Sequence, residues 1–378
     1  MKNTVLNEIK NILNQNDFPE EPEFSAAILK SRDIIIYGCG SGFVTLSMFV
    51  LNRHKIVPSI VLDKKFTEPE LKKDILFRSP DGYDPDTETL EKSLVIVTLG
   101  SAEARNEITC DLKKMGFRHV ISAMDIYEYH LPNPDERIFR GFSFYQDNCR
   151  NILEALELFN DDKSREIFKQ FLFTHIYRKC MPIPCDPLEN QYFPFDLWDN
   201  SVYRRSVICG AYNGDTATAM VRKAAQIESL VCLEPDPANF DELKKNIKPY
   251  RNRVSDLLLL PLGVYEKSIQ MRFAADNQSN SVISQDGNLL IQCIALDDCL
   301  SDIAPTFISM DIEGSEMFAL KGMKEIIKNN HPKLAICVYH SPEHIWEIPL
   351  FLQSLVPEYK FYLRNYTSFS SETVLYAD

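Results

Sequence analysis

The sequence has no long hydrophobic run and no excess of basic residues. No apolar stretch approaches the ~18 residues that span a bilayer, so we expect no transmembrane helix. The 378 residues include 41 Lys and Arg against 54 Asp and Glu, which gives a formal net charge of −13. Because an acidic chain without a basic tract repels phosphate backbones, we expect no nucleic-acid partner.

The sequence also lacks a Cys-x-x-Cys pair, and we expect no secretory leader in it. Its ten cysteines are scattered, and Cys209, Cys232 and Cys337 fall inside apolar runs that are typical of buried strands. Residues 1–15 carry apolar side chains at helical spacing, which predicts an amphipathic helix rather than a signal peptide. We therefore expect reduced thiols in a cytoplasmic protein.

A strand, a glycine turn and a helix follow one another twice along the chain. The pattern occupies residues 33–50 and 206–222, and each copy is followed by a second apolar run that ends in an acid, Asp63 or Glu234. This arrangement is typical of α/β units that bind nucleotides. Hydrophobic residues make up 45% and charged residues 25% of the chain, as in ordinary globular proteins.

The length predicts two domains, and the change in pattern between the two units suggests where they divide. We predict a Rossmann-like α/β domain over residues 1–125 and a helical connector with an entry loop over 126–195. A second α/β domain is predicted over 196–378. The first domain carries Gly38, Gly40 and Gly42 with Asp63, but its third glycine comes one residue too early for a G-x-G-x-x-G turn. A structural or acceptor-binding role suits it better than a second active site.

The glycine turn of the second unit is the first candidate ligand site. Glycine allows a sharp turn and a close approach of the ligand, and the following helix points its N–H groups at that ligand. Glu234, which ends the next strand about 20 residues on, could accept hydrogen bonds from ribose hydroxyls. The alternative is that Glu234 stabilises the N-terminus of the following helix.

Asp311 and His340 follow two further predicted strands of this unit. Open α/β sheets bind ligands at the carboxyl ends of their strands, so both side chains are candidates for catalysis. His340 is the first candidate for a general base, and Asp311 could be a base, orient His340 or contact a cofactor. Alternatively, His340 only anchors a loop, and Glu313 and Glu316 are acids of a helix first turn.

The string His340-Ser341-Pro342-Glu343-His344 matches the H-x-x-E-H pattern of some zinc proteases. That pattern needs both histidines one turn apart on a continuous helix. Pro342 is suited to start a helix after a Ser341 cap, which leaves His340 outside the helix. We therefore reject a zinc protease and assign no metal-ligating residue, and the sequence leaves open any need for a divalent metal.

Six stretches of the second unit together resemble the FkbM family of S-adenosylmethionine-dependent methyltransferases over roughly residues 190–378. They are Gln191-Tyr192-Phe193-Pro194, Cys209 to Thr216 (CGAYNGDT), Leu233-Glu234-Pro235-Asp236, Ala295-Leu296-Asp297-Asp298, Met310 to Glu316 (MDIEGSE) with Leu320-Lys321-Gly322, and Glu372-Thr373-Val374-Leu375-Tyr376. The D-x-E-G-x-E…L-K-G block is the most specific. The resemblance implies a class I methyltransferase fold, a seven-stranded doubly wound α/β sheet, preceded here by the smaller Rossmann-like domain and the connector.

The resemblance implies S-adenosyl-L-methionine as cofactor and methyl transfer to a hydroxyl oxygen of a saccharide or other small metabolite. Asp311, His340 and Glu313 would be catalytic, and Tyr192 and Phe193 would line the entrance. The cofactor-binding residues would be Gly210, Ala211, Tyr212, Asn213, Gly214, Asp215, Thr216, Glu234, Pro235 and Asp311.

The sequence departs from the family pattern at Ile208, two positions before the first glycine of the turn, where the family usually has an acid. This departure leaves open a non-catalytic binding module with a methyltransferase fold. A second alternative is an NAD(P)- or sugar-nucleotide-binding oxidoreductase or epimerase that uses the N-terminal domain. The sequence also leaves open whether the chain forms a homo-oligomer.

Overall fold

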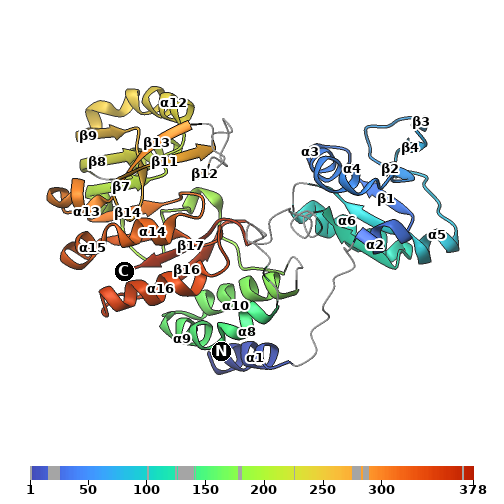
Figure 1. Ribbon diagram of the computed structural model, residues 1–378, viewed down its shortest axis with the longest axis horizontal. Coiled ribbons are helices and arrows are strands. Elements are labelled where there is room, and N and C mark those ends of the chain that lie inside the picture. The colour runs from blue at the N-terminus through green and yellow to red at the C-terminus, as the bar shows by residue number, and fades with distance from the viewer. Residues whose placement is uncertain are drawn as a thin grey trace. The chain divides into compact units, whose positions relative to one another are not determined.

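The computed structural model describes residues 2–15, 26–99, 102–123, 126, 140, 142–177, 181–224, 226–274, 282–283, 289–367 and 370–378 (Figure 1). The chain divides into two compact units. The C-terminal unit comprises Met1–Leu13, Tyr145–Leu172 and Pro182–Asp378, and the N-terminal unit comprises Asn14–Phe144 and Phe173–Met181. In the part of the chain described, no helix is both long enough and apolar enough to cross a membrane.

A seven-stranded sheet forms the centre of the C-terminal unit, with strand order β16-β17-β15-β14-β7-β8-β9. The strands are β7 (Arg205–Cys209), β8 (Ile227–Leu233), β9 (Val254–Leu260), β14 (Phe307–Met310), β15 (Lys333–Cys337), β16 (Phe361–Asn365) and β17 (Thr373–Ala377). Five strands are parallel, and β17 pairs antiparallel with both β15 and β16. This confirms the predicted doubly wound sheet with its terminal hairpin.

Helices that follow the strands complete the doubly wound pattern of this unit. They are α11 (Asp215–Lys223), α12 (Pro237–Ile247), α13 (Leu296–Cys299), α14 (Glu316–Lys321), α15 (Lys324–Asn330) and α16 (His344–Leu355), with 3₁₀ turns at Leu188–Asn190, Asn200–Arg204, Lys248–Arg253 and Ser301–Ile303. Two short helices, α14 and α15, follow β14 in place of one continuous helix. The break falls at Gly322, where a Cβ atom would lie 2.1 Å from the Tyr265 carbonyl oxygen.

The amphipathic N-terminal helix α1 (Lys2–Leu13) belongs to the C-terminal unit. Its apolar side chains, Ile9 among them, are buried, and α1 packs against α9 (Cys149–Leu158). Glu8 of α1 forms an ion pair at 2.8 Å with Lys169 of α10 (Asp162–Tyr177). The grouping therefore differs from the predicted domain boundaries, because α1 and part of the predicted connector join the C-terminal unit.

A small second sheet is inserted between β9 and β14, with strand order β10-β13-β11-β12. Its strands are β10 (Gly263–Val264), β11 (Ile269–Ala274), β12 (Val282–Ile283) and β13 (Leu289–Ile294). β11 and β13 form an antiparallel pair outside the main sheet. Phe273 and Cys293 are buried in this small sheet.

The N-terminal unit contains a six-stranded sheet with order β3-β4-β2-β1-β5-β6. Its elements are α2 (Ala26–Ser31), β1 (Ile34–Tyr37), α3 (Ser41–Leu46), a π-helical stretch (Ser47–Leu51), α4 (Asn52–His54), β2 (Ile60–Leu62), β3 (Glu70–Lys72), β4 (Ile75–Arg78), α5 (Thr87–Lys92), β5 (Leu94–Val97), α6 (Ala102–Met115) and β6 (His119–Ser122). The parallel order β4-β2-β1-β5-β6 confirms a Rossmann-like domain. In the predicted connector, the structure contains α8 (Phe142–Asp147), α9 and α10, while 127–139 and 178–180 lie outside the described residues.

The C-terminal sheet reverses its winding direction between β7 and β14. The chain runs from β7 through β8 to β9 on one side, and then returns to β14 on the other side of β7. Such a switch point leaves a crevice at the carboxyl ends of the two strands. The two strand ends approach so closely that a Cβ atom on Gly210 (φ +78°) would lie 1.8 Å from the Asp311 carbonyl oxygen.

Candidate functional site

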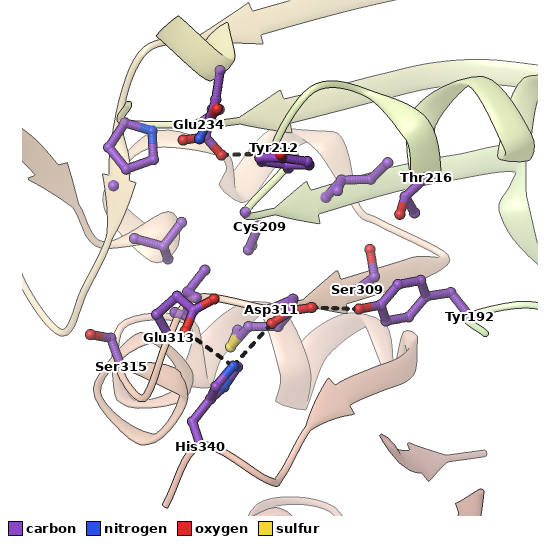
Figure 2. A pocket seen from close by; sticks show the side chains of 18 of the residues that line it. Tyr192, Cys209, Tyr212, Thr216, Glu234, Ser309, Asp311, Glu313, Ser315 and His340 are labelled. Atoms are coloured by element: carbon purple, nitrogen blue, oxygen red, sulfur yellow. Dashed lines mark hydrogen bonds and ion pairs between the residues drawn. The ribbon is translucent and has the colours of Figure 1, made fainter. Parts of the chain in front are cut away.

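A cavity of about 610 Å³ opens at the carboxyl ends of β7, β8, β14 and β15. Figure 2 shows Glu234 and Tyr212 on one side of it and Asp311, Glu313 and His340 on the opposite side. Its volume falls within the range of about 300–1,000 Å³ that is typical of small-molecule sites. The switch point of the sheet thus carries a ligand-sized cavity lined by ionisable groups.

The glycine turn after β7 forms one wall of this cavity. The N–H groups of Gly210 and Ala211 donate to the Leu233 carbonyl at 3.0 and 2.9 Å, which ties the turn to the end of β8. Gly214 has a φ of +85°, and a Cβ atom there would lie 2.8 Å from Cδ1 of Leu243. The positive φ angles and close contacts of Gly210 and Gly214 both require glycine. Helix α11 begins directly after Gly214.

Most of the predicted cofactor-binding residues line the cavity, and three do not. Gly210, Tyr212, Asp215, Thr216, Glu234, Pro235 and Asp311 line it. Ala211 is buried in the core, Gly214 packs against Leu243, and the Asn213 carbonyl accepts a hydrogen bond from Asn246 Nδ2 at 2.9 Å. These three shape the turn.

Glu234 points into the site from the end of β8, although its side chain has little contact with solvent. Its oxygens accept hydrogen bonds from the backbone N–H groups of Tyr212 at 2.8 Å and Asp236 at 2.9 Å. Burial raises the pKa of Glu234 to about 7, and these two N–H donors only partly oppose the shift. The alternative role at the helix N-terminus belongs to Asp236, which caps α12 through Ala238 N–H and Asn239 N–H.

The three predicted catalytic residues lie together on the opposite side. His340 Nε2 is 3.4 Å from Asp311 Oδ1 and 3.5 Å from Glu313 Oε2. Glu313 has a left-handed backbone (φ 54°) in the loop before α14, so it is not a first-turn acid of that helix. Burial raises the pKa of Glu313 to about 7, although the positive charge of His340 opposes this.

Glu316 is a partner of His340 whose role the sequence left undecided. It is completely buried, accepts a hydrogen bond from His340 Nδ1 at 2.8 Å and lies 3.3 Å from His344 Nδ1. The N–H groups of Ile312 and Gly314 also donate to its carboxylate. Although burial alone would raise its pKa, the two histidines hold the pKa of Glu316 well below its ordinary value.

This pairing changes the role expected of His340. Burial would lower the pKa of the imidazole, but the charge and hydrogen bond of Glu316 outweigh it and raise the pKa to about 10. At neutral pH the ring is therefore an imidazolium, which donates hydrogen bonds rather than accepting a proton. The carboxylates of Asp311 and Glu313 remain as proton acceptors at this end of the cavity.

Tyr192 reaches the same cluster from the entry loop. Its hydroxyl donates to Asp311 Oδ2 at 2.9 Å, across a separation of 119 residues, and its N–H donates to the Tyr376 hydroxyl at 3.1 Å. Tyr192 lines the cavity as predicted. Phe193, which we expected beside it, is instead buried against Tyr203 with ring centroids 5.3 Å apart.

Sequence reasoning missed a group of polar side chains on the cavity wall, namely Gln191, Ser309, Tyr339, Thr367, Ser371 and Glu372. Gln191 Nε2 donates to Glu372 Oε2 at 2.6 Å. Ser309 pairs in register with Ile208 on the neighbouring strand, and its buried hydroxyl has no hydrogen-bond partner. The only signal in the sequence was the presence of Gln191 and Glu372 in two of the family-like stretches.

Comparisons with known proteins show a family match and a similar fold. Residues 209–367 match the family model described as Methyltransferase FkbM domain. The chain is similar in structure to a methyltransferase FkbM from Methylobacillus flagellatus KT, with 22% identity, a TM-score of 0.79 and coverage of 100% of this chain and 99% of that chain. An O-methyltransferase from Bacillus cereus in complex with SAH matches at 11% identity and a TM-score of 0.33, covering 58% of this chain and 91% of that chain. No curated protein matches the sequence.

Proposed function

Because residues 209–367 match the family model described as Methyltransferase FkbM domain, we propose that the protein transfers a methyl group from S-adenosylmethionine to a hydroxyl oxygen of a saccharide or another small metabolite. The observation that carries this proposal is the single cavity with two differently built sides. Glu234 and the glycine turn form one side, and the Asp311–Glu313–His340 cluster forms the other.

The Glu234 side suits the adenosyl part of the cofactor. Glu234 retains lone pairs beyond its two backbone hydrogen bonds, and these can accept the ribose hydroxyls. Val264, Phe273 and Ile291 add an apolar surface that suits an adenine ring. Bound S-adenosylmethionine would supply an electrophilic methyl carbon on a sulfonium.

Ser309 offers a replacement for the acid that is missing at Ile208. The two residues are register partners on β14 and β7, and both line the cavity. The Ser309 hydroxyl is buried and unpaired, so a polar group of the methionine moiety would satisfy it. The departure from the family pattern is therefore compatible with cofactor binding.

The cluster side suits an acceptor hydroxyl. A hydroxyl is a weak nucleophile at neutral pH until a base takes its proton, and the Asp311 and Glu313 carboxylates can accept that proton. The His340 imidazolium can stabilise the negative charge that develops on the oxygen. The polar side chains of Gln191, Tyr339 and Glu372 would hydrogen-bond further hydroxyls, which favours a saccharide.

Isothermal titration calorimetry with S-adenosylmethionine tests the cofactor assignment. Glu234→Ala removes charge-assisted hydrogen bonds worth about 1.5–3 kcal/mol, so we expect a 10–100-fold loss of affinity. Asp63→Ala is the matched control, because Asp63 ends the corresponding strand of the N-terminal unit and binds Cys39 N–H at 2.7 Å. An unchanged affinity in Glu234→Ala would contradict the ribose assignment, and tight NADH binding without S-adenosylmethionine binding would favour an oxidoreductase.

Radiolabelled methyl transfer to a panel of monosaccharides and nucleotide sugars tests the reaction itself. We expect label in a product that resists mild base, as an ether does and an ester does not. Label that is released by mild base would mean that a carboxylate, not a hydroxyl, is methylated.

A further inference from the structure

The geometry points to a binding site for one divalent transition-metal cation, formed by Asp311 Oδ1, Glu313 Oε2 and His340 Nε2. These three atoms lie within 4.8 Å of one another. The sequence analysis assigned no metal ligand and rejected only a zinc protease, because the H-x-x-E-H string does not lie on one helix. The structure combines one histidine of that string with two acids from a different loop.

The spacing of the three atoms suits a shared cation. His340 Nε2 lies 3.4 Å from Asp311 Oδ1 and 3.5 Å from Glu313 Oε2. Two ligands that are each about 2.1 Å from a metal lie roughly 3.0 Å apart at a right angle and roughly 3.4 Å apart at a tetrahedral angle. A cation could therefore bind with little movement of these side chains.

Two of the three atoms that would face the cation, His340 Nε2 and Asp311 Oδ1, are buried and make no hydrogen bond. The side chain of His340 is 9% exposed, and its Nε2 has no hydrogen-bond partner. The Oδ1 atom of Asp311 is also buried and has no hydrogen-bond partner. Buried polar atoms are nearly always hydrogen-bonded, and these two form only a long ion pair at 3.4 Å, so a shared partner could satisfy both of them.

Neighbouring groups already hold the two innermost ligands in position. Glu316 binds Nδ1 of His340, which turns Nε2 toward the acids, and Tyr192 binds Oδ2 of Asp311, which leaves Oδ1 free. A carboxylate on the far nitrogen of a ligating histidine is a common feature of metal sites, where it fixes the ring and increases its basicity.

The charge balance of the cavity also favours a cation. Four carboxylates lie at this end, those of Asp311, Glu313, Glu316 and Glu372, and no Lys or Arg is among the described residues that line the cavity. One nitrogen and two oxygen ligands favour a divalent first-row transition metal, from Mn²⁺ through Zn²⁺ in that row. Mg²⁺ and Ca²⁺ are disfavoured because they prefer oxygen ligands alone.

The open side of the site faces the cavity, so the acceptor oxygen could complete the coordination. This role rests on the proposed methyl transfer. A cation bound to Nε2 would displace the proton of the His340 imidazolium into the solvent. It would lower the pKa of a coordinated hydroxyl, as it does for water, and would replace the stabilisation otherwise given by that imidazolium.

Mn²⁺ binding to the full-length chain, dialysed against a chelator, tests the site. We expect the free-Mn²⁺ signal in electron paramagnetic resonance to fall until one ion is bound per chain, with electron spin-echo modulation from a ¹⁴N ligand. His340→Gln should abolish that modulation. Glu313→Gln, which leaves the Glu316 pairing intact, should weaken binding at least 10-fold, and His331→Asn, an exposed histidine of the same unit, should change neither quantity.

Two results would overturn the metal site: no ¹⁴N modulation in the wild-type chain, or equal Mn²⁺ affinity in wild type and Glu313→Gln. Calorimetry with S-adenosylmethionine on the same chelated sample separates this outcome from failure of the proposed function. If the cofactor binds and no Mn²⁺ does, the metal site falls and the methyltransferase proposal stands. If Mn²⁺ binds with ¹⁴N modulation and the cofactor does not, the metal site stands and its assigned role falls.

Discussion

Glu316 accepts a hydrogen bond from Nδ1 of His340 at 2.8 Å while its own side chain is completely shielded from solvent. The carboxylate lies at the start of α14 and the imidazole lies just after β15, so this contact links two segments behind the cavity. A buried charge is tolerated only where partners compensate it, and here His340, His344 and two backbone N–H groups do so. The orientation of His340 therefore depends on a residue that does not itself line the cavity.

The first prediction concerns the loss of this buried charge. Glu316→Gln removes the buried carboxylate charge that pairs with Nδ1 of His340, and breaking a buried ion pair typically costs about 3–5 kcal/mol. We expect the free energy of unfolding at pH 7 to fall by that amount in urea titrations. Glu325→Gln is the control, because Glu325 is exposed and pairs only with Lys328 at 3.4 Å, and it should change the value by less than about 1 kcal/mol. Equal effects of the two substitutions would refute the role assigned to Glu316.

The second prediction concerns the pH dependence of stability through Glu234. Its carboxyl has a pKa of about 7 in the folded protein against 4.5 ordinarily, because burial disfavours the charged form. The unfolded chain therefore loses this proton first as pH rises, and stability falls between pH 4.5 and 7 by about 3 kcal/mol. Below pH 4.5 Glu234 is protonated in both the folded and the unfolded chain, so it does not contribute to the change of unfolding free energy with pH.

Glu234→Gln, which cannot ionise, should lack this contribution to the pH dependence. We expect the difference in unfolding free energy, variant minus wild type, to become more positive from pH 4.5 to 7, whatever constant offset the amide introduces. Urea titrations at pH 4.5, 5.5, 6.5 and 7.5 measure it. A difference that is the same at all four values would mean that burial does not raise the pKa of Glu234.

The residues at strand ends could be predicted from the sequence because their positions follow from local patterns. Runs such as Leu230–Leu233 and Ile308–Met310 identify buried strands, and parallel strands bring their carboxyl ends to one edge. Glu234, Asp311 and His340 were therefore expected to share a site, and all three line the cavity.

The contacts that determine the chemistry could not be predicted, because they join residues that no local pattern relates. Tyr192 meets Asp311 across 119 residues, and Gln191 meets Glu372 across 181. From the sequence, Glu316 could equally have been an ordinary acid in the first turn of a helix. Its role depends on His340, which follows β15, and on His344, which begins α16, and no local pattern relates these histidines to Glu316. The amphipathic pattern of α1 predicted a helix, but it did not determine that this helix packs in the C-terminal unit.

The third prediction concerns the closest approach of two strand ends. A methyl group on Gly210 would lie 1.8 Å from the Asp311 carbonyl oxygen, and alanine also disfavours the φ of +78°. We expect Gly210→Ala to lower the unfolding free energy by more than 2 kcal/mol, on the scale of about 1–3 kcal/mol for backbone strain alone. The fraction of the Gly210→Ala variant that remains soluble should also bind S-adenosylmethionine less tightly than wild type, because the added methyl group displaces Asp311.

Gly40→Ala is the control for that substitution. Gly40 lies in the corresponding glycine turn of the N-terminal unit, has a φ of −97°, and has open space where a methyl group would be added. We expect its unfolding free energy to stay within about 0.5–1 kcal/mol of wild type. If Gly210→Ala proved as stable as Gly40→Ala, the close approach of Gly210 to Asp311 would not exist in solution.

The last prediction concerns Tyr192 as a positioning residue. Its hydroxyl holds Asp311 Oδ2 at 2.9 Å, so Tyr192→Phe leaves that oxygen unpaired and lets the carboxylate turn away from the acceptor. Hydrogen bonds to charged groups are worth about 1.5–3 kcal/mol, which corresponds to a 10–100-fold loss. We expect the loss in kcat, with the KM for S-adenosylmethionine changed less than 3-fold. Tyr359→Phe is the matched control, because it removes an equally buried hydroxyl that binds the Pro332 carbonyl at 2.7 Å, away from the cavity. A purely structural role would make the two variants alike: both would lose stability and neither would lose kcat at a temperature where it remains folded.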